Sequence, residues 1–299
     1  MPGPQNFHLQ LRDCWRGLWR AKKLSWISFD EGGFELSDFE HCDNPVNADL
    51  HEVVPGKLIA MRGPRMMDDG AMFKDLPDGS RAFSPAYYAD ILRQYDVQVV
   101  ARLNEPQYKV EEFEREGLAV ADLHFDDCTV PPASVVAKFL AIAEAVPGGV
   151  AVHCKAGLGR TGTLIALYMM KHHGFTAREA MGWLRIVRPG SVIGEQQDYL
   201  CRVEAAIHRA GDRFRERGGG GDCRVAMGAA VEEVAGLVAA AVAAVDVRSG
   251  GKGGTGAAAV GSELLRVSSA PSIQRLAAHV ESAAGARSLE RSKSELSLG

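Results

Sequence analysis

The sequence predicts an α/β fold in which helices flank a central mixed or parallel sheet. Short apolar runs, typical of buried strands, alternate with longer segments of helical apolar spacing. This alternation extends over roughly residues 25–214 and then stops. Four glycines at 218–221 and long runs of Ala, Gly and Ser follow. We therefore expect residues 215–299 to form a low-complexity, mostly disordered tail.

The individual elements can be placed from their end signals. Ser84 followed by Pro85 is typical of a helix start, and Gly174 is typical of a helix end. Thr176 and Glu179 have the spacing of a capping box, which indicates another helix start. The predicted strands are 97–103, 118–125 and 149–153, and the predicted helices start at 85, cover 134–146 and 161–173, start at 176, and cover 195–209.

Composition excludes several classes of function. The chain has 299 residues, 46% of them hydrophobic, and a net charge of −4. This charge argues against general nucleic-acid binding, which needs a basic face. We expect no signal peptide, because residues 1–11 lack an apolar core, and no membrane span. The nearest candidate span, 229–245, is short, alanine-rich and contains Glu232 and Glu233, so we expect at most a lone helix with nothing to pack it.

The six cysteines show no CxxC pair and no regular spacing. We therefore expect no disulfide framework and no zinc site, and no cofactor is implied. A reducing compartment follows, so we expect an intracellular protein of the nucleus or the cytoplasm. Cys154 differs from the others because the residues around it have a recognisable chemistry.

Residues 153–162 read HCKAGLGRTG and lie between a predicted strand and a predicted helix. A loop that ends at a helix N-terminus directs backbone N–H groups at one point, and the helix dipole adds positive potential there. Glycines permit the turns that aim successive amides inward. The segment predicts a cradle for a tetrahedral phosphoryl dianion, formed by Lys155, Ala156, Gly157, Leu158 and Gly159.

Three side chains of this segment carry the predicted chemistry. Cys154 is placed to attack phosphorus as a thiolate. Arg160 can hold two phosphoryl oxygens with its planar fork, and the Thr161 hydroxyl can donate to the thiolate. The cysteine–arginine spacing alone is a weak signal, because Cys14 and Arg20 repeat it. We expect that copy to be a helix with buried tryptophans.

The leaving oxygen needs a general acid, and the loop at 125–132 offers two. Asp126 and Asp127 are adjacent there, and spacing does not choose between them. Hydrolysis of the phosphocysteine intermediate also needs a positioned water. Gln196 and Gln197 at the start of the last predicted helix are candidates for this role, although glutamine is common on helix surfaces.

The chain resembles a known family over roughly residues 10–210. The family is that of the cell-division-cycle-fourteen, or mitotic-exit, dual-specificity phosphatases. The RPGS run at 188–191 is more diagnostic than the catalytic loop, which many phosphatases share. The similar segments are 54–57 (VPGK), 63–64 (GP), 100–104 (VARLN), 151–162 (AVHCKAGLGRTG), 168–172 (YMMKH) and 183–194 (WLRIVRPGSVIG).

The resemblance implies a protein tyrosine phosphatase-like fold and a role in the cell cycle. It implies hydrolysis of phosphoserine, phosphothreonine and phosphotyrosine on phosphorylated protein substrates. It further implies that Asp127 is the general acid and that Gln196 positions the water. The family prefers phosphoserine followed by proline and then a basic residue, which an acidic groove reads. The matching groove positions are Glu40, Asp43 and Asp49.

The resemblance also suggests how the chain is divided. Family members carry an extra domain of the same fold before the catalytic domain, and the substrate groove lies between the two. Residues 1–24 resemble a remnant of that domain, 25–54 a linker, and 55–214 the catalytic domain. Because one wall of the groove would be missing, we expect exposed apolar surface on the linker side.

Two other functions remain open at this stage. Phosphoinositide phosphatases share the HCKAG start but usually need a second lysine, where this chain has Leu158. A non-catalytic phosphate-binding module would usually lack the cysteine, the arginine or the acid, and all three are present.

The tail adds one partner hypothesis. Arg266, Ser269 and Pro271 are spaced like a site for a phosphoserine-reading adaptor protein, once Ser269 is phosphorylated. The alternative is a random serine-rich tail.

Overall fold

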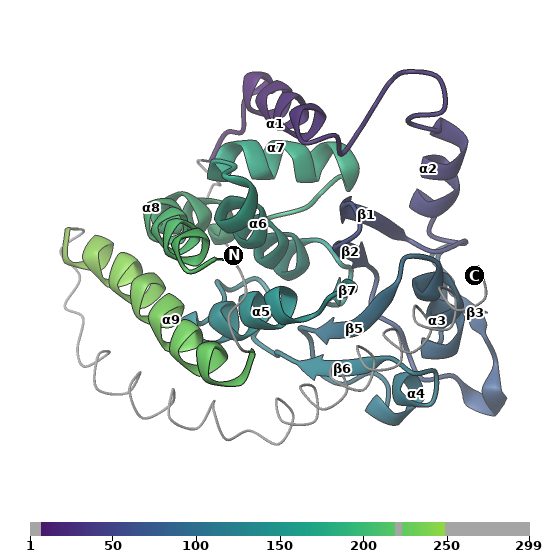
Figure 1. Cartoon of the computed structure of the whole chain (residues 1–299). Coiled ribbons are helices and arrows are strands. Elements are labelled where there is room, and N and C mark those ends of the chain that lie inside the picture. Colours follow the sequence, from purple (N-terminus) through teal and green to yellow (C-terminus); the bar gives the residue numbers. More distant parts are fainter. Residues whose placement is uncertain (1–6, 219–222, 249–299) are drawn as a thin grey trace, which may run out of the picture.

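A five-stranded sheet in the order β1-β2-β7-β5-β6 forms the centre of the molecule (Figure 1). The structure is a computed structural model that describes residues 7–218 and 223–248. β1 is antiparallel to β2, and the other neighbouring strands are parallel. The predicted α/β class with a mixed sheet is therefore confirmed. The strands are β1 Leu50–Val54, β2 Leu58–Met61, β5 Val97–Arg102, β6 Ala119–Asp122 and β7 Gly149–His153, with β3 Phe73–Asp75 and β4 Arg81–Phe83 in a separate hairpin.

Helices cover both faces of the sheet, and each face has its own hydrophobic core. All residues of β7 are buried, as expected for a central parallel strand. Val150 and Val152 belong to one core and Ala151 to the other, because successive side chains of a strand point to opposite faces. The helices are α3 Pro85–Gln94 and α4 Val110–Glu114 on one side, and α5 Ala133–Ala145, α6 Gly159–His173, α7 Ala177–Val187, α8 Glu195–Glu216 and α9 Cys223–Arg248 on the other (Figure 1).

The predicted end signals act as expected. The Ser84 side chain accepts a hydrogen bond from the Tyr87 amide at the start of α3. Thr176 and Glu179 form both bonds of the capping box on α7. Gly174 ends α6 with a left-handed φ of 61°. Strand 149–153 was predicted with its observed bounds, whereas α6 begins two residues earlier than expected, at Gly159.

The prediction of a disordered tail from residue 215 is wrong for the next described segment. α8 continues to Glu216, and α9 packs against α5 and α8 rather than standing alone (Figure 1). Val231, Val234 and Val238 of α9 are buried in the core on this side of the sheet. Glu233 pairs with Arg213 of α8 at 2.5 Å. Residues 249–299, including the predicted adaptor site at Ser269, lie outside the described residues.

The first helix, α1 (Leu11–Lys23), packs on α7 (Figure 1). Trp15 is 63% exposed and Trp19 is 60% exposed, so the prediction of buried tryptophans is wrong. The buried residues of α1 are Asp13, Gly17 and Ala21. A Cβ on Gly17 would lie 2.4 Å from the Glu179 carbonyl oxygen, so only glycine permits this close approach. The exposed apolar surface expected on the linker side is present, because Phe29, Phe34 and Leu36 are exposed.

Candidate active site

Three parallel strands end together at one edge of the sheet, and their continuations form the site. β7 leads into the loop 154–158 and then into α6. β5 leads to Leu103, and β6 leads to Phe125 and the loop with the two aspartates. The carboxyl ends of parallel strands are the usual location of ligand sites in α/β proteins. The predicted phosphate loop and the predicted acid loop therefore meet for a topological reason.

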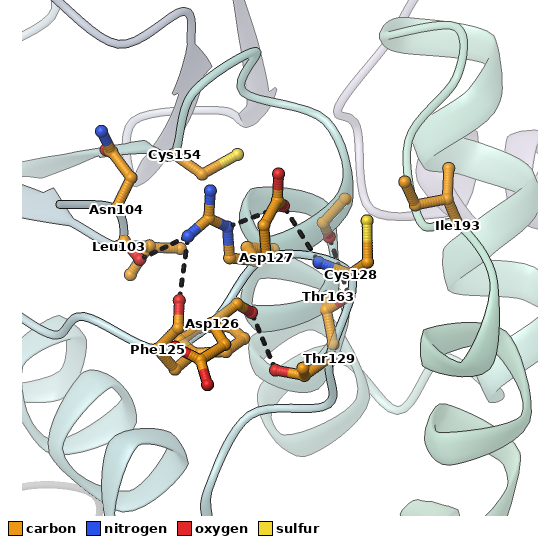
Figure 2. A network of polar contacts seen from close by, with 12 residues as sticks. Leu103, Asn104, Phe125, Asp126, Asp127, Cys128, Thr129, Cys154, Thr163 and Ile193 are labelled. Carbon is orange, nitrogen blue, oxygen red and sulfur yellow. Dashed lines mark hydrogen bonds and ion pairs between the residues drawn. The ribbon is translucent and has the colours of Figure 1, made fainter. Parts of the chain in front are cut away.

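Arg160 lies under this loop with its guanidinium held in place. Its side chain is 1% exposed. Nη1 donates to the carbonyl oxygens of Phe125 at 2.9 Å and Leu103 at 3.2 Å, which come from the ends of two different strands. Cys154 is also buried, at 4% exposure, and its sulfur points toward the centre of the contacts drawn in Figure 2. The thiol and the guanidinium predicted to share one phosphoryl group are thus brought to the same place.

The two candidate acids differ in orientation. Asp127 Oδ1 lies 3.2 Å from Arg160 Nε and accepts a hydrogen bond from the Cys128 amide at 3.0 Å. In Figure 2 the Asp127 carboxylate points toward Cys154, whereas the Asp126 carboxylate points away from it. The Asp126 carbonyl accepts from the Thr129 hydroxyl at 2.8 Å, which stabilises the turn. Asp127 is therefore the aspartate placed beside the cysteine and arginine.

The two candidate glutamines separate in the same way. Gln196 is fully buried, and its Nε2 donates to the Thr129 carbonyl of the acid loop at 3.0 Å. Its Oε1 would lie 3.0 Å from a Cβ on Gly159, so the side chain reaches the start of α6. Gln197 instead accepts from Arg185 of α7 at 2.6 Å. Gln196 thus contacts the acid loop and lies beside Gly159, where the phosphate loop meets α6.

Thr161 does not make its predicted contact. Its hydroxyl is buried and has no hydrogen-bond partner among the described residues, so the expected bond to the Cys154 sulfur is not formed. The five residues predicted to form the cradle differ in exposure. Lys155 and Ala156 are exposed, Gly157 and Gly159 are buried, and Leu158 is half-buried at the N-cap of α6.

Sequence reasoning assigned no role to a buried group behind Cys154. Tyr108 Oη lies 2.8 Å from His153 Nε2, and His153 Nδ1 lies 3.1 Å from the Cys154 carbonyl oxygen. Burial lowers the pKa of His153 to about 4, so the ring is neutral at physiological pH. The pair fixes the backbone at the nucleophile. The only sequence signal was that His153 precedes the cysteine, and nothing in the spacing pointed to Tyr108.

The three predicted groove acids are not equivalent. Glu40 is exposed on α2 (Leu36–Asp43) and has no ion pair among the described residues. Asp43 Oδ1 lies 3.2 Å from His51 Nε2. Asp49 Oδ1 accepts from Arg188 Nη2 at 2.6 Å, so its charge is already paired within the protein.

The described residues contain no group of three His, Cys, Asp or Glu side chains that could hold a metal ion. No helix within 7–218 or 223–248 is both long and apolar enough to cross a bilayer.

Known proteins similar to this chain agree with the geometry. The family described as "Dual specificity phosphatase, catalytic domain" matches residues 84–205. The human dual specificity protein phosphatase CDC14C is 39% identical over 215 residues, which are 72% of this chain and 46% of the relative. The Caenorhabditis elegans tyrosine-protein phosphatase cdc-14 is 40% identical over 202 residues, which are 68% of this chain and 27% of the relative. The chain thus spans less than half the length of these relatives.

Solved structures of similar proteins include Tk-PTP in its active form and human DUSP28. Tk-PTP is 25% identical with a TM-score of 0.41, covering 50% of this chain and 92% of its own. DUSP28 is 17% identical with a TM-score of 0.38, covering 54% of this chain and 95% of its own. The curated relatives carry the assignment, since their identity extends over most of this chain. The chain belongs to the CDC14 group of dual specificity phosphatases.

Proposed function

We propose that the chain is a cysteine-dependent protein phosphatase that hydrolyses phosphoserine, phosphothreonine and phosphotyrosine. One observation carries this proposal. The Arg160 guanidinium is fixed by two backbone carbonyls beside Cys154, and the Asp127 carboxylate lies 3.2 Å from its Nε. A nucleophile, an anion binder and a proton donor thus surround one point at a helix N-terminus.

The proposed first step is an in-line displacement. The Cys154 thiolate attacks phosphorus while Arg160 and the loop amides bind the phosphoryl oxygens. A bound phosphoryl group needs the Arg160 Nε, so Asp127 moves from Nε to the leaving oxygen. The P–O ester bond breaks as the Asp127 proton passes to that oxygen, and a phosphocysteine forms.

The proposed second step restores the enzyme. Gln196 positions a water on phosphorus, and the Asp127 carboxylate removes a proton from it. The P–S bond breaks, inorganic phosphate leaves, and Cys154 is again a thiolate. Gln196 supports this assignment because it already contacts the acid loop through the Thr129 carbonyl.

The substrates that we propose are phosphorylated proteins, with phosphoserine followed by proline favoured and a role in the cell cycle. Leu158, where phosphoinositide phosphatases need a second lysine, disfavours the lipid alternative. A basic residue downstream of the phosphoserine would pair with Glu40, the groove acid without an ion pair of its own among the described residues.

Kinetics on a small panel tests the proposal. The panel contains phosphoserine-proline peptides with and without a downstream lysine, a phosphotyrosine peptide, an aryl phosphate and a phosphoinositide. Cys154→Ser should abolish turnover of all of them, and unchanged rates would refute the enzyme assignment. Asp127→Asn should lower kcat by roughly 10²–10⁴-fold on phosphoserine peptides. The loss should be smaller on the aryl phosphate, whose leaving group needs less protonation.

Asp126→Asn is the matched control, because it makes the same change one residue away. It should retain most of the activity. A larger loss for Asp126→Asn than for Asp127→Asn would reverse the assignment of the acid.

A further inference from the structure

A second buried arginine holds the phosphate loop from behind. Arg188 follows the last residue of α7 and is 2% exposed. Its Nε donates to the Gly157 carbonyl oxygen at 2.8 Å, and its Nη2 donates to the Ala156 carbonyl oxygen at 3.0 Å. One guanidinium thus binds two consecutive carbonyls in the middle of the loop.

These two bonds fix the direction of two amides. In a planar trans peptide the N–H points opposite to the C=O of the same peptide group. Holding the carbonyls of Ala156 and Gly157 therefore fixes the N–H groups of Gly157 and Leu158, which point away from Arg188. A phosphate cradle requires its amides to converge on the ligand, and this requires its carbonyls to point outward. Arg188 supplies partners for exactly two such outward carbonyls.

Close packing around Gly157 leaves the phosphate loop little room to adopt another backbone conformation. Gly157 has a left-handed φ of 70°, and a Cβ there would lie 2.1 Å from the Met61 carbonyl oxygen and 3.0 Å from Arg188 Nη2. The back of the loop is therefore packed against the end of β2 and against the guanidinium.

Asp49 and His51 hold the other side of Arg188. Asp49 Oδ1 accepts from Nη2 at 2.6 Å, and His51 Nδ1 lies 3.1 Å from Nη1. Burial, with the charge of Arg188 as a smaller cause, lowers the pKa of His51 to about 3. The imidazole is therefore neutral and can accept a hydrogen bond at Nδ1.

Sheet topology explains why Asp49 reaches the phosphate loop. β1 is antiparallel to β2, so the start of β1 lies beside the end of β2, with Leu50 opposite Met61. β2 is parallel to β7, with Met61 opposite His153, the residue before the nucleophile. Asp49, immediately before β1, is thus carried to the edge where the loop begins.

We propose that Arg188 is a positioning residue that orients the phosphate-binding amides, and that Asp49 acts on substrate through Arg188 rather than by direct contact. This inference rests on the proposed phosphatase function. It replaces the groove role suggested for Asp49 by the sequence. Lysine cannot reproduce the arrangement, because a single ammonium does not have the rigid, multiply donating fork of arginine.

Binding of tungstate, a phosphate-like oxyanion, tests the inference without any turnover. Calorimetry is performed on the full chain carrying Cys154→Ser, alone and combined with Arg188→Lys or Asp49→Asn. We expect Arg188→Lys to weaken tungstate binding tenfold or more, and Asp49→Asn to weaken it severalfold. Arg178→Lys, the same change at the other end of α7, should leave the affinity unchanged.

Kinetic measurements on chains that keep the natural Cys154 separate the two possible roles of Asp49. As a positioning residue, Asp49→Asn lowers kcat/KM on a small aryl phosphate and on every peptide alike. As a groove residue, it would raise KM only for peptides with a downstream lysine and would leave tungstate binding intact. Thermal unfolding of each variant shows how much of any loss in affinity or activity reflects lost stability. If Arg188→Lys fails to fold, Asp49→Asn still tests the inference.

The outcomes are distinguishable from failure of the proposed function. Suppose that the Cys154→Ser chain binds tungstate and the wild-type chain hydrolyses phosphate esters, but that Arg188→Lys and Asp49→Asn stay within twofold of these references; this inference alone is then refuted. If the Cys154→Ser chain does not bind tungstate and the wild-type chain does not hydrolyse the panel, both are refuted.

Discussion

The packing of α9 can be tested with one buried side chain. Val238 lies in the middle of α9 and is 1% exposed, in the core that α9 shares with α5 and α8. Val238→Ala removes two buried methyl groups, worth about 0.8 kcal/mol each in transfer free energy. The cavity left behind adds a further cost, so we expect a loss of about 1.6–2.5 kcal/mol in the free energy of unfolding.

Urea unfolding followed by tryptophan fluorescence measures this loss directly. For a domain of this size, the melting temperature should fall by about 2–4 °C per kcal/mol. Glu232→Ala is the control, because it truncates an exposed side chain on the same helix. Its effect should stay within about 0.5 kcal/mol. If the two variants do not differ, α9 does not pack against the domain in solution and the reasoning fails.

Two more predictions concern acid stability and the phosphate loop. Burial lowers the pKa of His51 to about 3 and of His153 to about 4, while the unfolded chain binds these protons near 6.5. Stability should therefore fall as the pH drops below 6.5, by about 2 kcal/mol per ring between pH 7 and pH 5. Urea midpoints that do not change with pH would contradict this. Gly157→Ala should weaken tungstate binding at least tenfold, since its Cβ would meet the Met61 carbonyl at 2.1 Å. Gly56 has a similar φ of 68° but open space around it, so the Gly56→Ala variant should bind tungstate with the same affinity as the unsubstituted chain.

The central strand, the phosphate loop and the helix after it were predictable because their signals are local. Strand 149–153 was placed with its observed bounds, and Ser84, Gly174 and Thr176 ended or began helices as expected. Backbone hydrogen-bond demands at helix ends involve residues only a few positions apart, so the sequence displays them.

The failures have a different physical origin, since they depend on partners distant in sequence. A helix at 229–245 was expected at most to stand alone with nothing to pack it, yet the valines of α9 at 231, 234 and 238 share one face that packs against α5 and α8. The tryptophans of α1 were expected inside, but glycine faces α7 at a distance that no larger residue permits.

Long-range polar contacts were equally hidden. Arg188 was noted only as part of a diagnostic motif, although it reaches Gly157, a residue 31 positions earlier. Asp49 and Asp43 were expected to line an acidic substrate groove. Only the sheet order shows that Asp49 lies beside the arginine behind the phosphate loop.

The anchoring of Arg160 has a consequence for the entropy of ligand capture. A free arginine side chain samples many rotamers, and freezing it costs about 2 kcal/mol. Here the carbonyls of Leu103 and Phe125 have already restricted that motion before any ligand arrives. A phosphoryl group bound as proposed would therefore meet a guanidinium whose conformational entropy is already reduced, which is an advantage of about thirtyfold in affinity over a mobile arginine.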